Sequence, residues 1–139
     1  MVQLLLASEA KQSLSDYISR HSDILADKFL AIIYVGDNSS SASYVRMKKK
    51  FGEKHGIETR IYGQEEEQTL ETLTDLIHDL NTDDRCAGIM IQLPLPSHLQ
   101  PYATKLCSLI SPQKDVDGLG GQLLGLSTIG VRDVRPATP

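Results

Sequence analysis

The chain has 139 residues, of which 40% are hydrophobic and 23% are charged, and its formal net charge is −4. This composition is typical of a single soluble globular domain with an ordinary core. The acidic balance gives no basis for a nucleic-acid partner or an anionic membrane surface, and no apolar run reaches the ~18 residues that would span a bilayer. The sequence also has no secretory signal pattern, so we expect a cytoplasmic protein.

Apolar runs and helical periodicities alternate along the chain, after a short apolar lead-in at 2–6 that is expected as a strand or an extended arm. Helices are expected at 8–25, 41–55, 68–80 and 101–110, strands at 28–35, 57–62 and 86–93, a loop at 111–121 and a weakly structured tail at 131–139. Alternating strands and helices predict right-handed crossovers on a parallel sheet. We therefore expect an α/β fold, a three-layer αβα domain with a mostly parallel sheet and an active cleft at the carboxyl ends of the strands.

The first candidate site follows the strand at 28–35. This strand stops at Gly36, and a serine-rich loop leads into the helix at 41–55. Tyr44 and Lys48 are four residues apart and share one helix face, where an aromatic ring beside a lysine suits a flat heterocyclic substrate. Any amphipathic helix can also carry this pair, as a tyrosine at the core edge and a lysine in solvent.

Polar side chains follow the third expected strand as well. Gln92 stands before Pro94 and Pro96, which end strand pairing, so it can point into a ligand crevice or satisfy backbone groups of the loop. Isolated Cys86 and Cys107 and four scattered histidines form no metal-binding pattern. We expect two buried thiols and no metal site.

Two acids, Asp115 and Asp117, stand before a glycine-rich turn at 118–121. Either carboxylate can accept paired N–H groups from a heterocycle, or it can cap the turn. The turn is not a dinucleotide fingerprint, because no strand leads into it and position 123 is Leu123 where the fingerprint needs glycine.

Four motifs, in this order, resemble the methylenetetrahydrofolate dehydrogenase/cyclohydrolase family. They are Val35-Gly36 with Ser41-x-x-Tyr44-x-x-x-Lys48, Gln92-Leu-Pro-Leu-Pro96, Pro112-x-Lys114-Asp-Val-Asp-Gly118 and Pro136-x-Thr138-Pro139. The resemblance covers nearly the whole chain and only the amino-terminal, folate-binding domain of that family.

The resemblance implies a bifunctional enzyme of one-carbon metabolism that serves purine biosynthesis. Such an enzyme oxidises 5,10-methylenetetrahydrofolate to the methenyl form with NADP or NAD, and hydrolyses the product to 10-formyltetrahydrofolate. Residues 1–130 are then the catalytic domain, and 131–139 start a linker to a Rossmann domain, missing from this chain, that binds the NADP or NAD. A folate substrate, a homodimer of the full-length protein and no metal are also implied.

Carried over by position, Lys48, Gln92 and Tyr44 are the implied catalytic residues. Lys48 assists proton transfer during hydrolysis and Gln92 hydrogen-bonds it. Tyr44 stacks on the aromatic part of the substrate, and Asp117 anchors the N–H groups of the pterin ring. The implied substrate-binding residues are Ser41, Tyr44, Lys48, Gln92, Leu93, Pro94 and Asp117. The family's asparagine beyond the glycine-rich turn is replaced by Leu123.

Two other functions compete with this one. A Tyr-x-x-x-Lys pair with an upstream serine also marks short-chain dehydrogenases, but these need a glycine-rich turn after the first strand and residues 2–12 contain none. The second alternative is a truncated, non-catalytic module that binds folate or dimerises. It stays open at this point, because such a module would carry the same residues.

Overall fold

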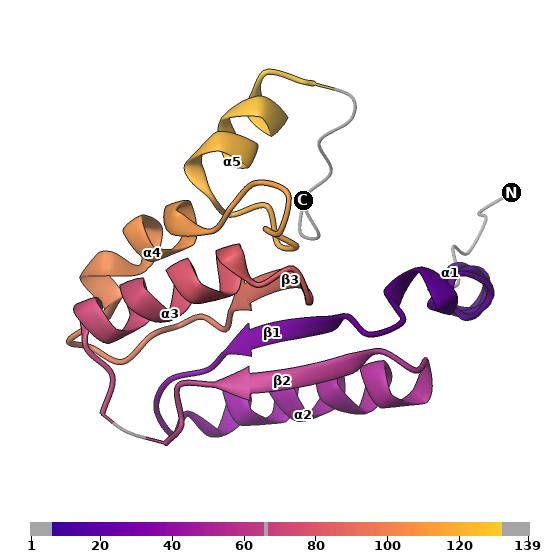
Figure 1. The fold of residues 1–139 in the computed structure, drawn as a ribbon, viewed down its shortest axis with the longest axis horizontal. Helices are drawn as coiled ribbons and strands as arrows, with labels where there is room; N and C mark the ends of the chain where they lie inside the picture. Colours follow the sequence, from indigo (N-terminus) through magenta and orange to yellow (C-terminus); the bar gives the residue numbers. More distant parts are fainter. Residues whose placement is uncertain (1–6, 66, 132–139) are drawn as a thin grey trace, which may run out of the picture.

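The computed structural model describes residues 7–65 and 67–131 (Figure 1). Three strands form one parallel sheet in the order β2-β1-β3. The elements in chain order are α1 (Ala7–Arg20), the 3₁₀ helix η1 (Ser22–Leu25), β1 (Phe29–Ile33), α2 (Ser39–Lys54), β2 (Glu58–Tyr62), α3 (Leu70–Thr82), β3 (Cys86–Ile91), the 3₁₀ helix η2 (Gln100–Tyr102), α4 (Ala103–Leu109) and α5 (Gly121–Thr128). The predicted α/β fold with a parallel sheet is confirmed.

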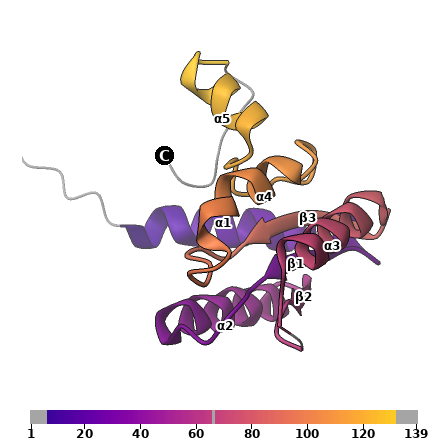
Figure 2. The same cartoon turned by 90° about the vertical axis from the view of Figure 1, so that its left-hand side faces the viewer.

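Helices cover both faces of the sheet. Figures 1 and 2 show α2 on one side of the strands and α3 and α4 on the other side. Successive side chains of a strand point to opposite faces, so β1 supplies both cores. Ala31 and Ile33 pack in the cluster that includes α3 and α4, whereas Ile32 packs with Val45 of α2. This arrangement gives the three layers that the sequence predicts.

Apart from shifts of a few residues at element ends, the helices differ from the sequence prediction in three places. The helix expected at 8–25 is two elements, because α1 ends at Arg20 and the tighter η1 leads to Asp27, whose φ of 63° turns the chain into β1. The helix expected at 101–110 opens with the 3₁₀ turn of η2. Helix α5 was not expected, and it buries no residue, so it lacks the apolar stripe that marks a helix in a sequence.

Two sequence predictions lie outside the described residues. These are the apolar lead-in at 2–6 and the Pro136-x-Thr138-Pro139 motif in the expected linker. Among residues 7–65 and 67–131, no helix has both the length and the apolar character needed to cross a membrane. In the same ranges, no three His, Cys, Asp or Glu side chains are grouped as ligands for a metal ion.

Candidate active site

Helix α2 begins at the carboxyl edge of the sheet. Gly36 has φ +89°, and a Cβ there would lie 3.0 Å from the Pro96 ring, so glycine lets the loop after β1 approach the loop after β3. The Asn38 side chain then accepts a hydrogen bond of 2.9 Å from the Ser41 backbone N–H and caps the helix. This turn fixes where α2 presents its side chains.

Lys48 and Gln92 meet across this edge. The Lys48 ammonium donates a hydrogen bond of 3.0 Å to Oε1 of Gln92, and both side chains are half-buried. Nε2 of Gln92 donates to the Leu93 carbonyl at 2.9 Å, and the Gln92 backbone N–H donates to the Ile33 carbonyl at 2.8 Å. Gln92 therefore satisfies backbone groups of the loop, as one of the two sequence interpretations expects, and it accepts a hydrogen bond from Lys48 as well.

The two acids before the glycine-rich turn have different environments. Asp115 caps the turn, because its Oδ1 accepts from the Gly118 N–H at 2.9 Å and its Oδ2 accepts from the Gly120 N–H at 2.8 Å. A Cβ at Gly120 would lie 2.8 Å from that Oδ2, so the close approach requires glycine. Of the two acids, Asp115 is the structural one.

Asp117 is half-buried, and within residues 7–65 and 67–131 its carboxylate has no hydrogen-bond donor. Burial raises the pKa of the Asp117 carboxyl, the Lys48 ammonium opposes this rise, and the Asp115 carboxylate adds to it. The influence of Lys48 brings Asp117 into the same electrostatic site as the Lys48–Gln92 pair. A desolvated carboxylate without donors is suited to accept N–H groups from a ligand.

The segment that carries Asp117 is held against β3 and α3. The Lys114 ammonium donates to the Leu80 and Asp83 carbonyls at 2.9 and 2.8 Å, at the carboxyl end of α3. A Cβ at Gly88 would lie 2.5 Å from Val116 Cγ1, so this glycine makes room for the segment. The sequence analysis assigned no role to Lys114 or Gly88, although a glycine inside an apolar strand is a signal of close approach by another chain segment.

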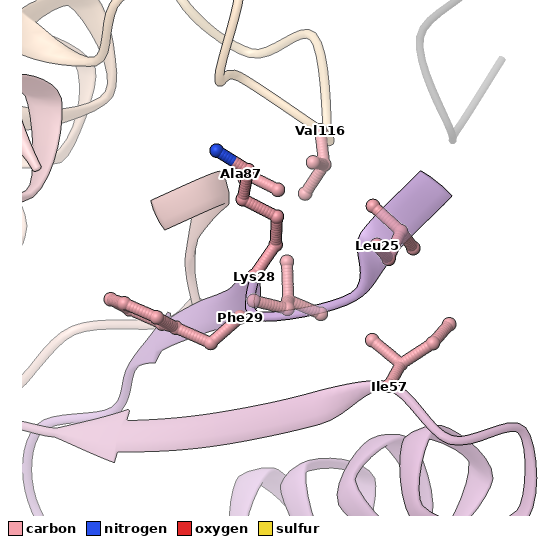
Figure 3. A pocket seen from close by; sticks show the side chains of 8 residues that line it. Leu25, Lys28, Phe29, Ile57, Ala87 and Val116 are labelled. Atoms are coloured by element: carbon pink, nitrogen blue, oxygen red, sulfur yellow. The ribbon is translucent and has the colours of Figure 1, made fainter. Parts of the chain in front are cut away.

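An apolar pocket of about 210 Å³ adjoins this segment at Val116 (Figure 3). Figure 3 shows Leu25 of η1, Ile57 just before β2, and Val116 of the segment before Asp117 around the pocket. The ammonium of Lys28, its one charged lining residue, donates to the Asp84 carbonyl. The lining residues are Leu25, Lys28, Phe29, Leu30, Ile57, Ala87, Gly88 and Val116. None of the predicted site residues lines this pocket, which lies beside the site.

The remaining predicted site residues differ in exposure. The Tyr44 ring is 55% exposed and free to contact a ligand, and Pro94 is exposed. Leu93 packs partly on the core that α3 and α4 cover. Ser41 is only 3% exposed, so it offers almost no surface to a substrate and contributes to the packing of α2.

Both cysteines are free and buried, as the sequence predicts. Burial raises the pKa of the Cys107 thiol to about 11, and the carboxylates of Asp115 and Asp117 add to this rise. Burial also raises the pKa of the Cys86 thiol. Neither thiol has the properties of a nucleophile at neutral pH.

Residues 4–117 match the family model described as tetrahydrofolate dehydrogenase/cyclohydrolase, catalytic domain. The chain belongs to this family. The family that the sequence resembles is thus confirmed, and the match is to the catalytic domain.

Curated and solved members of the family are similar along most of the chain. The bifunctional protein FolD of Acetivibrio thermocellus is 44% identical over 110 residues, which is 79% of this chain and 38% of the relative. The crystal structure of the bifunctional dehydrogenase/cyclohydrolase of Thermoplasma acidophilum superposes with a TM-score of 0.84 at 28% identity, over 99% of this chain and 49% of that one. The Trypanosoma brucei enzyme, solved with NADP and an inhibitor, gives 0.76 at 25% identity, over 92% and 44%.

The chain spans less than half of the length of these relatives. The similarity therefore identifies a domain and its fold.

Proposed function

We propose that this chain is the folate-binding catalytic domain of a bifunctional enzyme. In this proposal the enzyme oxidises 5,10-methylenetetrahydrofolate with NADP or NAD and hydrolyses the methenyl product to 10-formyltetrahydrofolate. The observation that carries the proposal is the hydrogen bond of 3.0 Å between Lys48 and Gln92 at the carboxyl edge of the sheet. The half-buried Asp117 carboxylate, whose pKa the charge of the Lys48 ammonium lowers against the effect of burial, supports the same site.

Each side chain of the site has a role that suits its chemistry. Asp117 accepts paired N–H groups of the pterin ring, because its carboxylate is desolvated and no donor from the described part of the chain occupies it. Tyr44 offers an exposed ring for the aromatic part of the substrate. Leu93 and Pro94 follow Gln92 directly and form the edge of the cleft, whereas Ser41 supports α2 from its buried side.

The hydrolysis needs one proton carrier. Water adds to the carbon of the methenyl bridge, and the neutral amine of Lys48 takes the proton that this water releases. The bond from that carbon to N5 then breaks and N5 takes up the proton from Lys48, while the hydroxyl on the carbon releases its own proton to solvent and becomes the formyl carbonyl on N10. Oε1 of Gln92 accepts a hydrogen bond from the Lys48 side chain and holds its nitrogen in place.

The described residues do not fit a dinucleotide phosphate. The glycine-rich turn is the segment with suitable backbone donors, and the Asp115 carboxylate already occupies its Gly118 and Gly120 N–H groups. We therefore derive no hydride-transfer step from this chain, and we place the binding of NADP or NAD in a part of the protein that it does not include.

We extend the proposal to a homodimer in the cytoplasm. Among the residues that the structure describes, strand β2 lies at the edge of the sheet and pairs with β1 alone, so its outer backbone groups can pair with a second copy. The two free, buried cysteines suit a reducing compartment. Light scattering of the purified protein tests the dimer, and a monomer at tens of micromolar would contradict it.

The experiment that tests the function follows the loss of 5,10-methenyltetrahydrofolate absorbance with the chain and no nucleotide. Lys48→Met should lower the enzyme-dependent rate by about 100-fold or more, because it removes the proton carrier. Lys49→Met, one residue along the same helix, is the matched control and should keep the rate. Equal rates for wild type and Lys48→Met would refute the role of Lys48.

A non-catalytic folate-binding or dimerising module is the second candidate. A chain that binds folate and shows no hydrolysis in the assay above would support this candidate over the first.

A further inference from the structure

The loop that joins β1 to α2, residues 34–38, is held by the chain segment that follows β2. Nε2 of Gln64 donates to the Tyr34 carbonyl at 2.6 Å and to the Gly36 carbonyl at 3.2 Å. Gly63 permits this approach, because its φ is +89° and a Cβ there would lie 3.0 Å from the Tyr34 carbonyl oxygen. Gln64 therefore supplies donors for two backbone carbonyls that lie beyond the end of β1.

The Tyr34 side chain holds the same loop from the core. Tyr34 is 7% exposed and packs with Ile32, Val45 and Met90 under α2. Its hydroxyl donates a hydrogen bond of 3.1 Å to the Asn38 carbonyl. Since Asn38 is the N-cap of α2, this bond connects the buried core directly to the residue before the first turn of the helix.

The position of α2 depends on this loop, because few of its own side chains are buried. Of the sixteen residues of α2, Ser41, Val45 and Gly52 are the buried ones. Lys48 reaches Gln92 from this helix at 3.0 Å. Proton transfer needs a heavy-atom distance of about 2.6–3.2 Å, and a misplacement of about 1 Å can lower a rate by about 100-fold. A shift of the start of α2 would therefore take Lys48 out of its working position.

We propose that Gln64 and Tyr34 are positioning residues for the hydrolysis. They act through Lys48, by fixing the start of α2, and need no contact with the substrate. This inference rests on the proposed function, because it needs Lys48 as the proton carrier. Substrate affinity depends less on the two residues, since Asp117 lies on a different segment and ring stacking at Tyr44 tolerates a range of distances.

The test measures kcat and KM for hydrolysis of 5,10-methenyltetrahydrofolate by the chain without nucleotide. Gln64→Glu keeps the shape of the side chain and removes both donors, so it should lower kcat about tenfold and change KM by less than about twofold. Tyr34→Phe removes one hydroxyl and should lower kcat about threefold. Gln122→Glu on α5 and Tyr17→Phe on α1 are the matched controls, because both side chains are exposed and lie outside the loop, and they should keep the wild-type kcat.

Double variants separate positioning from a general loss of structure. If Gln64 acts through the Lys48–Gln92 contact, Gln64→Glu should lower kcat less than about twofold once Gln92→Leu has removed that contact. In the Asp117→Asn background its effect on kcat should be undiminished, because Asp117 acts independently. An unchanged kcat of Gln64→Glu, or equal losses in the two backgrounds, would overturn the inference and leave the proposed function intact.

A second measurement is independent of activity. In NMR spectra of the labelled chain, Gln64→Glu should shift the side-chain amide signals of Gln92, and Gln122→Glu should leave them unchanged. A wild type without hydrolysis would contradict the proposed function, and these signals would still test whether Gln64 fixes the Lys48–Gln92 contact. Unchanged Gln92 signals in Gln64→Glu would overturn the positioning role as well.

Discussion

The two faces of the sheet differ in the size of the hydrophobic core that covers them. The face under α3 and α4 has a continuous core of sixteen buried residues. The face under α2 buries four, which are Ile32, Tyr34, Val45 and Met90. The Lys48–Gln92 pair and the pocket beside Val116 both border the α2 face. We infer that α3 and α4 supply most of the stability, and that the α2 face is left partly open for a ligand.

A cavity under α3 and α4 should lower the free energy of unfolding more than any other change predicted here. Leu106 of α4 is fully buried, so Leu106→Ala should lower the free energy of unfolding by about 3 kcal/mol, through lost burial and an unfilled cavity. Leu124→Ala on exposed α5 removes the same atoms and should change it by less than about 0.5 kcal/mol. Urea unfolding measures both, and equal effects would contradict the division between the faces.

On the open face, Asp117→Asn should weaken folate binding by about 10- to 100-fold, because it removes a charged acceptor of two N–H groups. The variant should also be more stable at neutral pH. The folded state raises the pKa of Asp117, so ionisation favours the unfolded chain and wild type loses stability as pH rises from the ordinary value of 3.8 through the folded pKa. The loss is complete above that range.

Asp115→Asn is the matched control for this prediction. It weakens the cap on the Gly118 and Gly120 N–H groups, so it should destabilise the fold at neutral pH. Thermal unfolding from pH 3 to pH 8 separates the two acids. A destabilised Asp117→Asn variant at pH 7 would contradict the environment described for Asp117.

Gly88→Ala tests how the Asp117 segment reaches the sheet. The new Cβ would lie 2.5 Å from Val116 Cγ1, and such overpacking costs about 1–3 kcal/mol. Adding Val116→Ala removes the clash, so the double variant should recover most of the stability and of the folate affinity. Additive losses in the double variant would show that Gly88 serves another purpose.

The smallest expected effect is that of Lys114→Met. It removes two hydrogen bonds to the carboxyl end of α3 and should cost about 1–2 kcal/mol of unfolding free energy. Lys105→Met, on the exposed side of α4, should cost less than about 0.5 kcal/mol. A folate affinity that falls while stability is unchanged would instead indicate that Lys114 contacts the ligand.

The strands and the main helices could be predicted from sequence because each is marked by an apolar run or stripe. The unpredicted α5 has no buried residue and contains Gly121 and Gly125, so neither signal was present. The sequence placed Lys48 and Gln92 at the same edge of the sheet, but their contact joins residues 44 positions apart and needs the assembled crossovers. The sequence alone also could not assign the turn cap to Asp115, since only the fold decides which carboxylate faces the glycine N–H groups.

The central claim is that the folate site lies at the open, α2-bordered edge of the sheet. A titration of the isotope-labelled chain with 5-formyltetrahydrofolate, followed by amide NMR shifts, tests it most directly. We predict that the largest shifts gather at Tyr44, Lys48, Gln92 and the Asp117–Gly118 turn, with little change in α3 and α4. Shifts centred on α3 and α4, or no saturable shifts at millimolar folate, would contradict the account.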